Sequence, residues 1–260
     1  MDLVQTLSGF VVGLIVGLTG VGGGSLMTPL LVLGFGVAPA TAVGTDLLYA
    51  AITKCGGVWV NARRQSIAWP VVGLLALGSL PASVLTIWGL HHFAIERARF
   101  DTLITTTLGV ALILTALAIL FRHKLRALGA RWGMATGEGD VGLHHRGLVV
   151  ASGAILGVLV TISSVGAGAL GVAGLFFLFP HFNTLRIVGT DIAHAVPLTL
   201  VAGLGHATLG SIDYQLLVAL LAGSLPGIYL GSHLAAKLPE VWLRSALATM
   251  LLLIGGKFVL

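Results

Sequence analysis

Three ionisable side chains stand inside long apolar stretches of the sequence, where a charge is costly and is usually kept for a function. Asp46 and Asp191 each lie early in such a stretch, and Lys54 follows Asp46 by eight residues, about two helical turns. A lone ammonium group in apolar surroundings attracts an anion, whereas a carboxylate there can carry a proton or orient other groups. Structural alternatives stay open: Lys54 could pair with a carboxylate or reach an interface, and the two aspartates could stabilise helix N-termini.

Two histidines, His194 and His206, occupy the same apolar stretch as Asp191. A neutral imidazole can donate a hydrogen bond to an oxyanion, so both are candidates for an anion site. For His206, a polar contact between helices is the simpler interpretation. The two are 12 residues apart with no third ligand at a metal-binding spacing, and Cys55 is the single cysteine. We therefore expect no metal site and no cofactor.

Two glycine-rich turns interrupt apolar segments at corresponding places, Gly22-Gly23-Gly24-Ser25 and Val165-Gly166-Ala167-Gly168. Neither is a phosphate loop, because no Gly-Lys-Ser/Thr follows. An unwound turn before a helix exposes backbone N–H groups and the positive end of the helix dipole. Two such turns near the middle of a membrane could bind an anion, although small residues there also allow close helix packing.

The sequence repeats itself. Val43-Gly44-Thr45-Asp46 recurs as Val188-Gly189-Thr190-Asp191, and Gly78-Ser79-Leu80-Pro81 recurs as Gly223-Ser224-Leu225-Pro226, both shifted by 145 residues. The glycine-rich turns correspond at a shift of 144. Thr45 and Thr190 therefore take equivalent places beside the aspartates, where their hydroxyls could bind substrate or cap a helix. One unit written twice in apolar residues is typical of membrane transporters built from two repeats.

Composition points to the lipid bilayer. The 260 residues are 57% hydrophobic and 9% charged, whereas soluble domains carry about 25% charged residues. A soluble fold would lack an adequate polar surface, so we predict an all-α integral membrane protein. The net charge of +5 is typical of basic residues at the cytoplasmic side, and their dispersion argues against a nucleic-acid partner.

Each half contains three apolar stretches long enough to span a membrane. They cover residues 40–60, 67–90 and 100–121 in the first half, and 187–209, 212–235 and 241–259 in the second. Each half begins instead with a broken or re-entrant element, 3–18 with 26–36 and 147–162 with 169–180, whose second pieces are too short to span comfortably. We predict a first repeat over 1–121, a polar, flexible cytoplasmic linker over 122–146 and a second repeat over 147–260.

Basic residues favour an inverted second repeat. If the halves were parallel, eight Lys and Arg residues would face the cytoplasm and five the outside, with Lys54 not counted. Inverting the second half moves Arg186, Lys237 and Arg244 inside and Lys257 outside, which gives ten inside and three outside. The inverted arrangement obeys the positive-inside rule better.

At these motifs the chain resembles the sulfite exporter TauE/SafE family of small two-repeat bacterial permeases. The resemblance rests on Gly17–Ser25, Pro29 and Ala42–Thr45, with counterparts at Val165–Gly168 and Val188–Thr190. It implies transport of a small sulfur-containing anion, such as sulfite or an organosulfonate, across the bacterial cytoplasmic membrane. The family often has serine after Gly-Thr, where this chain has Asp46 and Asp191.

We therefore predict a secondary transporter that works by alternating access. Its substrate site would combine the two glycine-rich turns with the polar residues of the helices that follow, Thr45, Asp46, Lys54, Thr190, Asp191, His194 and His206. A permease for a cation or another small metabolite using Asp46 and Asp191 is one alternative, and a non-transporting assembly subunit is another. An enzyme is excluded because no nucleophile–base pair or metal-ligand set is present. The oligomeric state, including a homodimer, stays open.

Overall fold

The computed structural model describes residues 3–19, 24–92, 97–132, 143–235 and 240–259. Within these ranges the chain is helical and contains no strand, as predicted. The helices are α1 (Leu3–Thr19), α2 (Gly24–Phe35), α3 (Pro39–Arg63), α4 (Trp69–His92), α5 (Arg97–Arg131), α6 (Leu143–Ser163), α7 (Ala169–Leu178), α8 (Thr184–Thr208), α9 (Tyr214–Ala235) and α10 (Glu240–Val259).

Five of the helices are long and apolar enough to cross a membrane: α4, α5, α6, α8 and α9. The prediction of an all-α membrane protein is confirmed. Large apolar side chains such as Leu77, Leu85 and Leu253 are exposed, as expected for a surface that faces lipid. Helix α3 falls outside the five, although it has 25 residues. It is nonetheless a central helix, since a continuous run of its side chains from Ala42 to Leu47 is buried.

The second pieces of the broken elements are the short helices α2, with 12 residues, and α7, with 10. At 1.5 Å per residue they measure about 18 Å and about 15 Å, too short for a hydrocarbon core of about 30 Å. Neither helix is long enough to cross such a core by itself, as the sequence indicated.

The polar stretch 122–146, predicted as a flexible linker, is helical at both ends. Helix α5 continues to Arg131 and α6 begins at Leu143. The continuation of α5 is held by packing on α7, where Gly129 lies so close to the carbonyl of Phe177 that a Cβ would overlap it. Arg126 also donates hydrogen bonds to the carbonyls of Pro180 (2.7 Å) and Phe182 (3.2 Å). Gly129 and Arg126 thus make contacts between segments of the fold. The sequence did not reveal these contacts, because glycine and arginine in a polar stretch usually indicate a loop.

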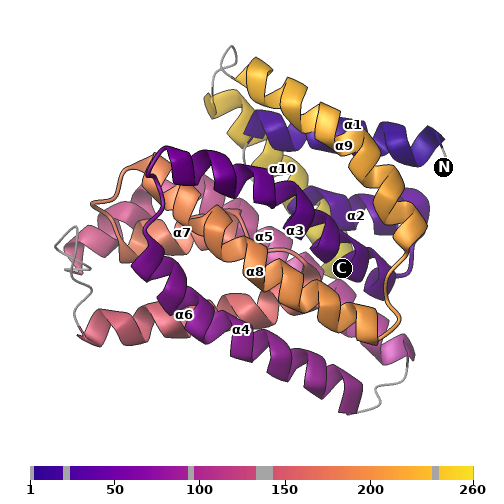
Figure 1. Ribbon diagram of the computed structural model, residues 1–260, viewed down its shortest axis with the longest axis horizontal. Coiled ribbons are helices and arrows are strands. Elements are labelled where there is room, and N and C mark those ends of the chain that lie inside the picture. Colours follow the sequence, from indigo (N-terminus) through magenta and orange to yellow (C-terminus); the bar gives the residue numbers. More distant parts are fainter. Residues whose placement is uncertain (1–2, 20–23, 93–96, 133–142, 236–239, 260) are drawn as a thin grey trace.

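Helices pair between the halves of the chain. In Figure 1, α1 and α9 lie side by side along one edge and α4 and α6 along the other, with α3 and α8 between them. Helix α5 packs on α10. The first helix of each half thus packs against the fourth helix of the other half. The third helices of the two halves pack against each other, and so do the fifth helices.

Glycines set these close crossings. A Cβ on Gly78 of α4 would overlap the carbonyl of Val150 on α6, and a Cβ on Gly223 of α9 would overlap the carbonyl of Thr6 on α1. Gly78 and Gly223 are related by the shift of 145, and Thr6 and Val150 by 144. Both crossings therefore use the same contact, in which a missing side chain lets two backbones touch.

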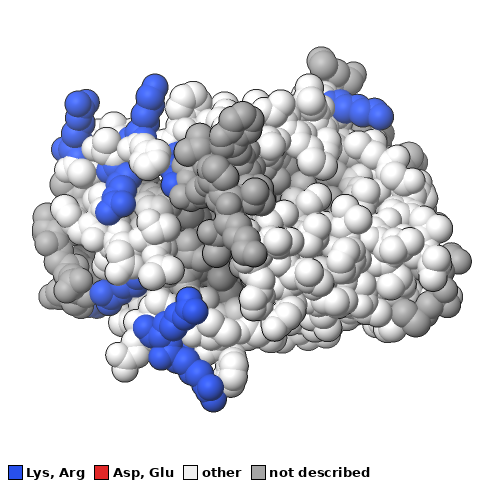
Figure 2. Space-filling view, turned by 90° about the horizontal axis from the view of Figure 1, so that it is seen from above, with Lys and Arg blue, Asp and Glu red and all other residues white. Residues whose placement is uncertain are grey.

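One end of the molecule collects most of the described basic residues. The C-terminal part of α3, with Arg63, meets the N-terminal part of α8, because Gly189 lies against Ser66 and Asn61. Arg126 reaches the chain just before α8, which places it at the same end. Figure 2 shows blue Lys and Arg side chains concentrated over the left half of one face and white side chains over most of the right half.

Two exposed tryptophans lie near the opposite ends of α4. Trp69 begins α4 and Trp88 lies near its end, and both are exposed. They are 19 residues apart, so about 28 Å separates them along the helix, close to the thickness of a hydrocarbon core. Tryptophans at these two depths fit the interfaces of a bilayer that α4 crosses.

We expect Gly78→Ala to destabilise the protein, because its Cβ would meet the backbone of α6. Overpacking of this kind costs about 1–3 kcal/mol, which would lower the melting temperature in detergent by about 3–10 °C. Gly73→Ala is the matched control, since a Cβ on this glycine of the same helix meets nothing within 4 Å. Equal melting temperatures for the two variants would contradict the proposed packing.

Candidate functional site

A buried polar cluster lies where α3 and α8 cross. It contains the five ionisable residues singled out in the sequence, Asp46, Lys54, Asp191, His194 and His206, each at most 9% exposed. Asp46 and Lys54 come from α3 and the other three from α8. The crossing of the two helices therefore brings residues from both halves of the chain into one buried region.

The α6–α7 turn borders this cluster. Helix α6 ends at Ser163, and the chain then takes positive φ values at Ser164 (58°), Gly166 (120°) and Gly168 (151°) before α7 begins. Glycine adopts such values without strain, which explains the two glycines here. The N–H groups of Gly171 and Val172 donate to the carbonyls of Gly166 (3.0 Å) and Gly168 (2.8 Å), and no side chain caps the helix. Among the described residues, the N–H groups of Ala169 and Leu170, the first two of α7, have no acceptor.

The corresponding turn of the first half is partly outside the described residues. Gly22 and Gly23 fall there, whereas Gly24 begins α2 and Ser25 is buried in its first turn. The prediction that Gly22 and Gly23 line a site thus concerns residues for which the structure gives no geometry.

Asp46 joins three segments of the chain. Its Oδ2 accepts hydrogen bonds from Thr28 Oγ1 of α2 (2.5 Å) and from Ser164 Oγ of the α6–α7 turn (2.9 Å). Its Oδ1 is buried without a hydrogen-bond partner. The carboxylate thereby fixes the short helix of one half against the broken turn of the other.

Lys54 makes a second contact with the same turn. Its Nζ donates a hydrogen bond to the carbonyl of Ala167, immediately before α7. Eight residues separate Lys54 from Asp46 on α3, so α3 holds the α6–α7 turn at two points along its length. The ammonium group consequently lies beside the N-terminal end of α7, which already carries a positive partial charge.

Asp191 lies against the first turn of α7. A Cβ on Gly171, the third residue of α7, would overlap Oδ1 of Asp191. Within the described ranges, no hydrogen bond or ion pair within 4.0 Å engages this carboxylate, which is 2% exposed. Lys54 is its charged neighbour, acting through the electrostatic field and not by direct contact.

The alternative interpretation of the aspartates as N-terminal helix charges is wrong. Helix α3 begins at Pro39 and α8 at Thr184, and neither has an acidic residue in its first turn. The side chain that caps α8 is Asn183, whose Oδ1 accepts from the N–H of Arg186 (2.7 Å). Asp46 and Asp191 lie two turns further on, deep in their helices.

Both threonines of the repeated phrase bind backbone N–H groups. Thr45 Oγ1 accepts from Asp213 N (3.1 Å), just before α9, and Thr190 Oγ1 accepts from Ala68 N (3.0 Å), just before α4. Each threonine thus fixes the start of a helix in the other half. Their hydroxyls hold helix junctions in this conformation and are not directed into the polar cluster.

The histidines have different environments. His194 Nε2 lies 2.8 Å from Ser79 Oγ of α4, within the second repeated phrase. His206 Nε2 lies 2.9 Å from the carbonyl of Thr161, near the end of α6, and its Nδ1 has no hydrogen-bond partner. The polar inter-helix contact expected for His206 is therefore present.

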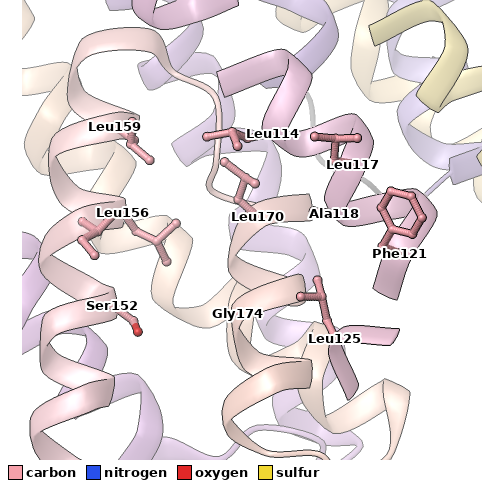
Figure 3. A pocket seen from close by; sticks show the side chains of 11 residues that line it. Leu114, Leu117, Ala118, Phe121, Leu125, Ser152, Leu156, Leu159, Leu170 and Gly174 are labelled. Carbon is pink, nitrogen blue, oxygen red and sulfur yellow. The ribbon is translucent and has the colours of Figure 1, made fainter. Parts of the chain in front are cut away.

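Two apolar grooves lie apart from this cluster. One, of about 400 Å³, is formed by α5, α6 and α7, and Figure 3 shows leucine side chains bordering it with Ser152 at one side. The other, of about 360 Å³, lies among α1, α2 and α10. Ser152, Ile155 and Leu170 of the first correspond to Ser8, Val11 and Leu26 of the second at the shift of 144. Their lining suits lipid chains and not an ionic substrate.

Sequence reasoning missed the partners that hold the charged residues. Thr28, Ser164 and the Ala167 carbonyl were not identified as contacts of Asp46 and Lys54, because only the fold brings them together. Ser79 could have been found, since it belongs to a phrase that the sequence repeats.

Comparison with known proteins gives a consistent picture. A model described as "Sulfite exporter TauE/SafE" matches residues 6–258. The chain is 40% identical over 263 residues to "Probable membrane transporter protein YjnA" of Bacillus subtilis (strain 168), with 100% of both chains covered. It is 30% identical over 223 residues to "Probable membrane transporter protein YdhB" of the same organism, covering 86% of each. No solved structure matches significantly.

Proposed function

The chain belongs to the sulfite exporter TauE/SafE family and is a multi-pass membrane permease, not an enzyme, and we propose that its cargo is a small sulfur-containing anion. Sulfite and organosulfonates are the candidates, and transport would follow alternating access. The Bacillus subtilis origin of the relatives is consistent with a bacterial cytoplasmic membrane.

One contact carries the proposal: Lys54 reaches the Ala167 carbonyl at the start of α7. It is the one buried basic side chain among the Lys and Arg residues whose burial the structure describes. An ammonium group and a helix N-terminus together create a positive region in the interior of the protein. In apolar surroundings such a region favours an anion over a neutral solute or a cation.

The substrate would bind between Lys54 and the first N–H groups of α7. Ser164, which now donates to Asp46, could turn its hydroxyl toward a sulfonate oxygen. Gly166 and Gly168 allow the turn to approach the anion closely, since no Cβ stands in the way. His194 lies on the same helix as Asp191 and could add a donor from its ring.

The polar cluster is closed to both sides in this conformation, because its ionisable residues are at most 9% exposed. A transporter must expose such a site to one side at a time. Movement of α3 relative to the α6–α7 turn would open it, since Asp46 and Lys54 are the contacts that hold the two together.

The pairs α1–α9 and α6–α4 use corresponding residues from opposite halves, as a two-fold axis between the halves requires. One further observation supports inverted repeats, in which that axis lies in the membrane plane. Arg186 lies in the first turn of α8, at the end of the molecule where Arg126 contacts the chain. The inverted arrangement predicts this position, whereas the parallel one puts Arg186 on the opposite side from Arg126.

A cation permease is the second candidate, favoured by the buried oxygens that lack partners. Asp46 Oδ1 has none, and the carboxylate of Asp191 has no described hydrogen bond. If Lys54 stays bound to the Ala167 carbonyl, the two carboxylates could bind a cation. Flux of rubidium without flux of any anion would decide for this candidate.

We expect Lys54→Ala to reduce exchange of labelled methanesulfonate in proteoliposomes. A charge-assisted hydrogen bond contributes about 1.5–3 kcal/mol, so initial exchange at low substrate should fall about 10- to 100-fold. Lys257→Ala, in the last turn of α10 and away from the cluster, is the matched control. Sulfite, sulfate, acetate and rubidium complete the panel of solutes.

Both variants must elute as single species and keep their melting temperature within a few degrees. If Lys54→Ala then exchanges methanesulfonate as fast as Lys257→Ala does, the proposed role of Lys54 is wrong.

Cysteine labelling tests the inverted arrangement. In a Cys55→Ser background, which removes the exposed native thiol, single cysteines replace the exposed residues Arg64, His181 and Gln215. A membrane-impermeant maleimide applied to intact cells should label Gln215→Cys. It should label Arg64→Cys and His181→Cys only after permeabilisation, because the basic end faces the cytoplasm. Labelling of Arg64→Cys and His181→Cys from opposite sides of the membrane would rule out the inverted repeat.

A further inference from the structure

Asp191 differs from Asp46 in what holds it. Oδ2 of Asp46 accepts hydrogen bonds from Thr28 and Ser164. Asp191, its counterpart at the shift of 145, has no hydrogen bond among the described residues and is 2% exposed. Of the two equivalent carboxylates, Asp46 is thus fixed by two hydroxyl groups, whereas Asp191 is free to change partners.

The position of Asp191 is that of an anion at a helix N-terminus. Its Oδ1 lies against Gly171 in the first turn of α7. Lys54 is bound to the Ala167 carbonyl, just before the same helix, and interacts electrostatically with Asp191. A carboxylate in this place competes with any substrate anion for the same positive region.

The charges of the cluster lead to a requirement for transport. With Asp46 and Asp191 ionised and Lys54 protonated, the buried cluster carries one net negative charge, and a bound sulfonate would make it two. Buried uncompensated charge is strongly unfavourable, more so within a membrane. A site that binds an anion here therefore needs one positive charge to arrive with the anion, and a buried carboxylate can take it up as a proton.

We propose that Asp191 is the proton-binding group of a proton–anion symport. When ionised it occupies the positive region before α7 as an internal anion, and when protonated it gives that region up to the substrate. This rests on the proposed function, because it takes a sulfur-containing anion as cargo.

The proton balance is simple. On the open side, one H⁺ from water adds to a carboxylate oxygen of Asp191, and one anion binds at Lys54 and the α7 N–H groups. The protein closes, opens to the other side, and releases the anion, after which the proton returns to water. One proton and one monovalent anion cross together, so each cycle moves no net charge.

Few other buried titratable groups lie on α8 or on the helices packed against it. Helix α3 carries Lys54, Asp46 and Tyr49, and α8 itself carries His194 and His206. Helix α7 has no ionisable residue, and neither do the parts of α4 and α6 that pack against α8, namely residues 70–90 and 150–163. Asp46 is held by its two hydroxyls and Lys54 by the Ala167 carbonyl, and each histidine already contacts an oxygen through Nε2. Asp191 is therefore the carboxylate whose ionised form no described hydrogen bond stabilises.

The test uses the full chain in proteoliposomes, with methanesulfonate as the probe because it stays ionised at all pH values used. Exchange of labelled against unlabelled methanesulfonate at equal pH measures binding and translocation alone. Net uptake under an inward proton gradient, with the membrane potential held at zero by potassium and valinomycin, measures coupling. A gradient of one pH unit should give about tenfold accumulation for one proton per anion.

We expect Asp191→Asn, which mimics the protonated carboxyl, to exchange methanesulfonate but to lose the accumulation driven by the gradient. Asp46→Asn is the matched variant, since its amide oxygen can still accept from Thr28 and Ser164. Its ratio of gradient-driven uptake to exchange should stay at the wild-type value even if both rates fall. Asp191→Glu keeps an ionisable group and should retain coupling. If Asp191→Asn does not exchange methanesulfonate, the coupling measured for Asp191→Glu tests the role of Asp191 instead.

The outcomes separate the two proposals. Wild-type exchange without any response to the proton gradient, or coupling that survives in Asp191→Asn, overturns the role of Asp191 and leaves anion transport standing. Loss of coupling in Asp191→Glu, where Asp191→Asn is inactive, overturns it as well. Absence of methanesulfonate exchange in the wild-type protein contradicts the proposed function itself.

Discussion

The cost of burying charge within a membrane is the constraint on which this structure depends. Asp46 and Lys54 lie on α3, and both find their partners in the α6–α7 turn, through Ser164 and the Ala167 carbonyl. On leaving this turn, Asp46 would keep only the hydroxyl of Thr28, and the Lys54 ammonium group would lose its described acceptor in apolar surroundings. The broken helix of the second half and the third helix of the first half are therefore bound to each other by the same groups that would meet an ionic substrate.

The remaining helices hold α3 and α8 in register. Glycine contacts press α1 onto α9 and α6 onto α4, and Thr45 and Thr190 fix the helix starts that follow. These contacts are the same in the two halves, whereas the polar cluster is not. Lys54 has Thr199 as its counterpart at the shift of 145, and Thr199 donates to a carbonyl of its own helix, that of Ala195 (2.8 Å). A frame of corresponding contacts thus surrounds an asymmetric centre.

The sequence predicted the helices and the residues of the polar cluster better than the contacts that these residues make. Repeated phrases and apolar stretches identified the helices, the two short pieces and the residues that cluster, because these depend on composition and spacing. The extension of α5 to Arg131 was missed, since it depends on the contacts of Gly129 and Arg126 with a distant segment. The contrast between Asp46 and Asp191 could not be predicted either. Both stand in the same phrase, and only the fold gives one of them two hydroxyl partners.

The central claim is that an anion binds beside Lys54 at the start of α7, and thermal unfolding in detergent tests it most directly. Methanesulfonate and sulfite are added to the wild-type protein and to Lys54→Ala, with chloride and rubidium as reference ions. A ligand at a hundredfold excess over its Kd stabilises the folded state by about 2.7 kcal/mol. If the anion binds there, a sulfur oxyanion raises the melting temperature of the wild-type protein by several degrees and leaves that of Lys54→Ala unchanged. Equal stabilisation of both proteins, or stabilisation by rubidium alone, would contradict it.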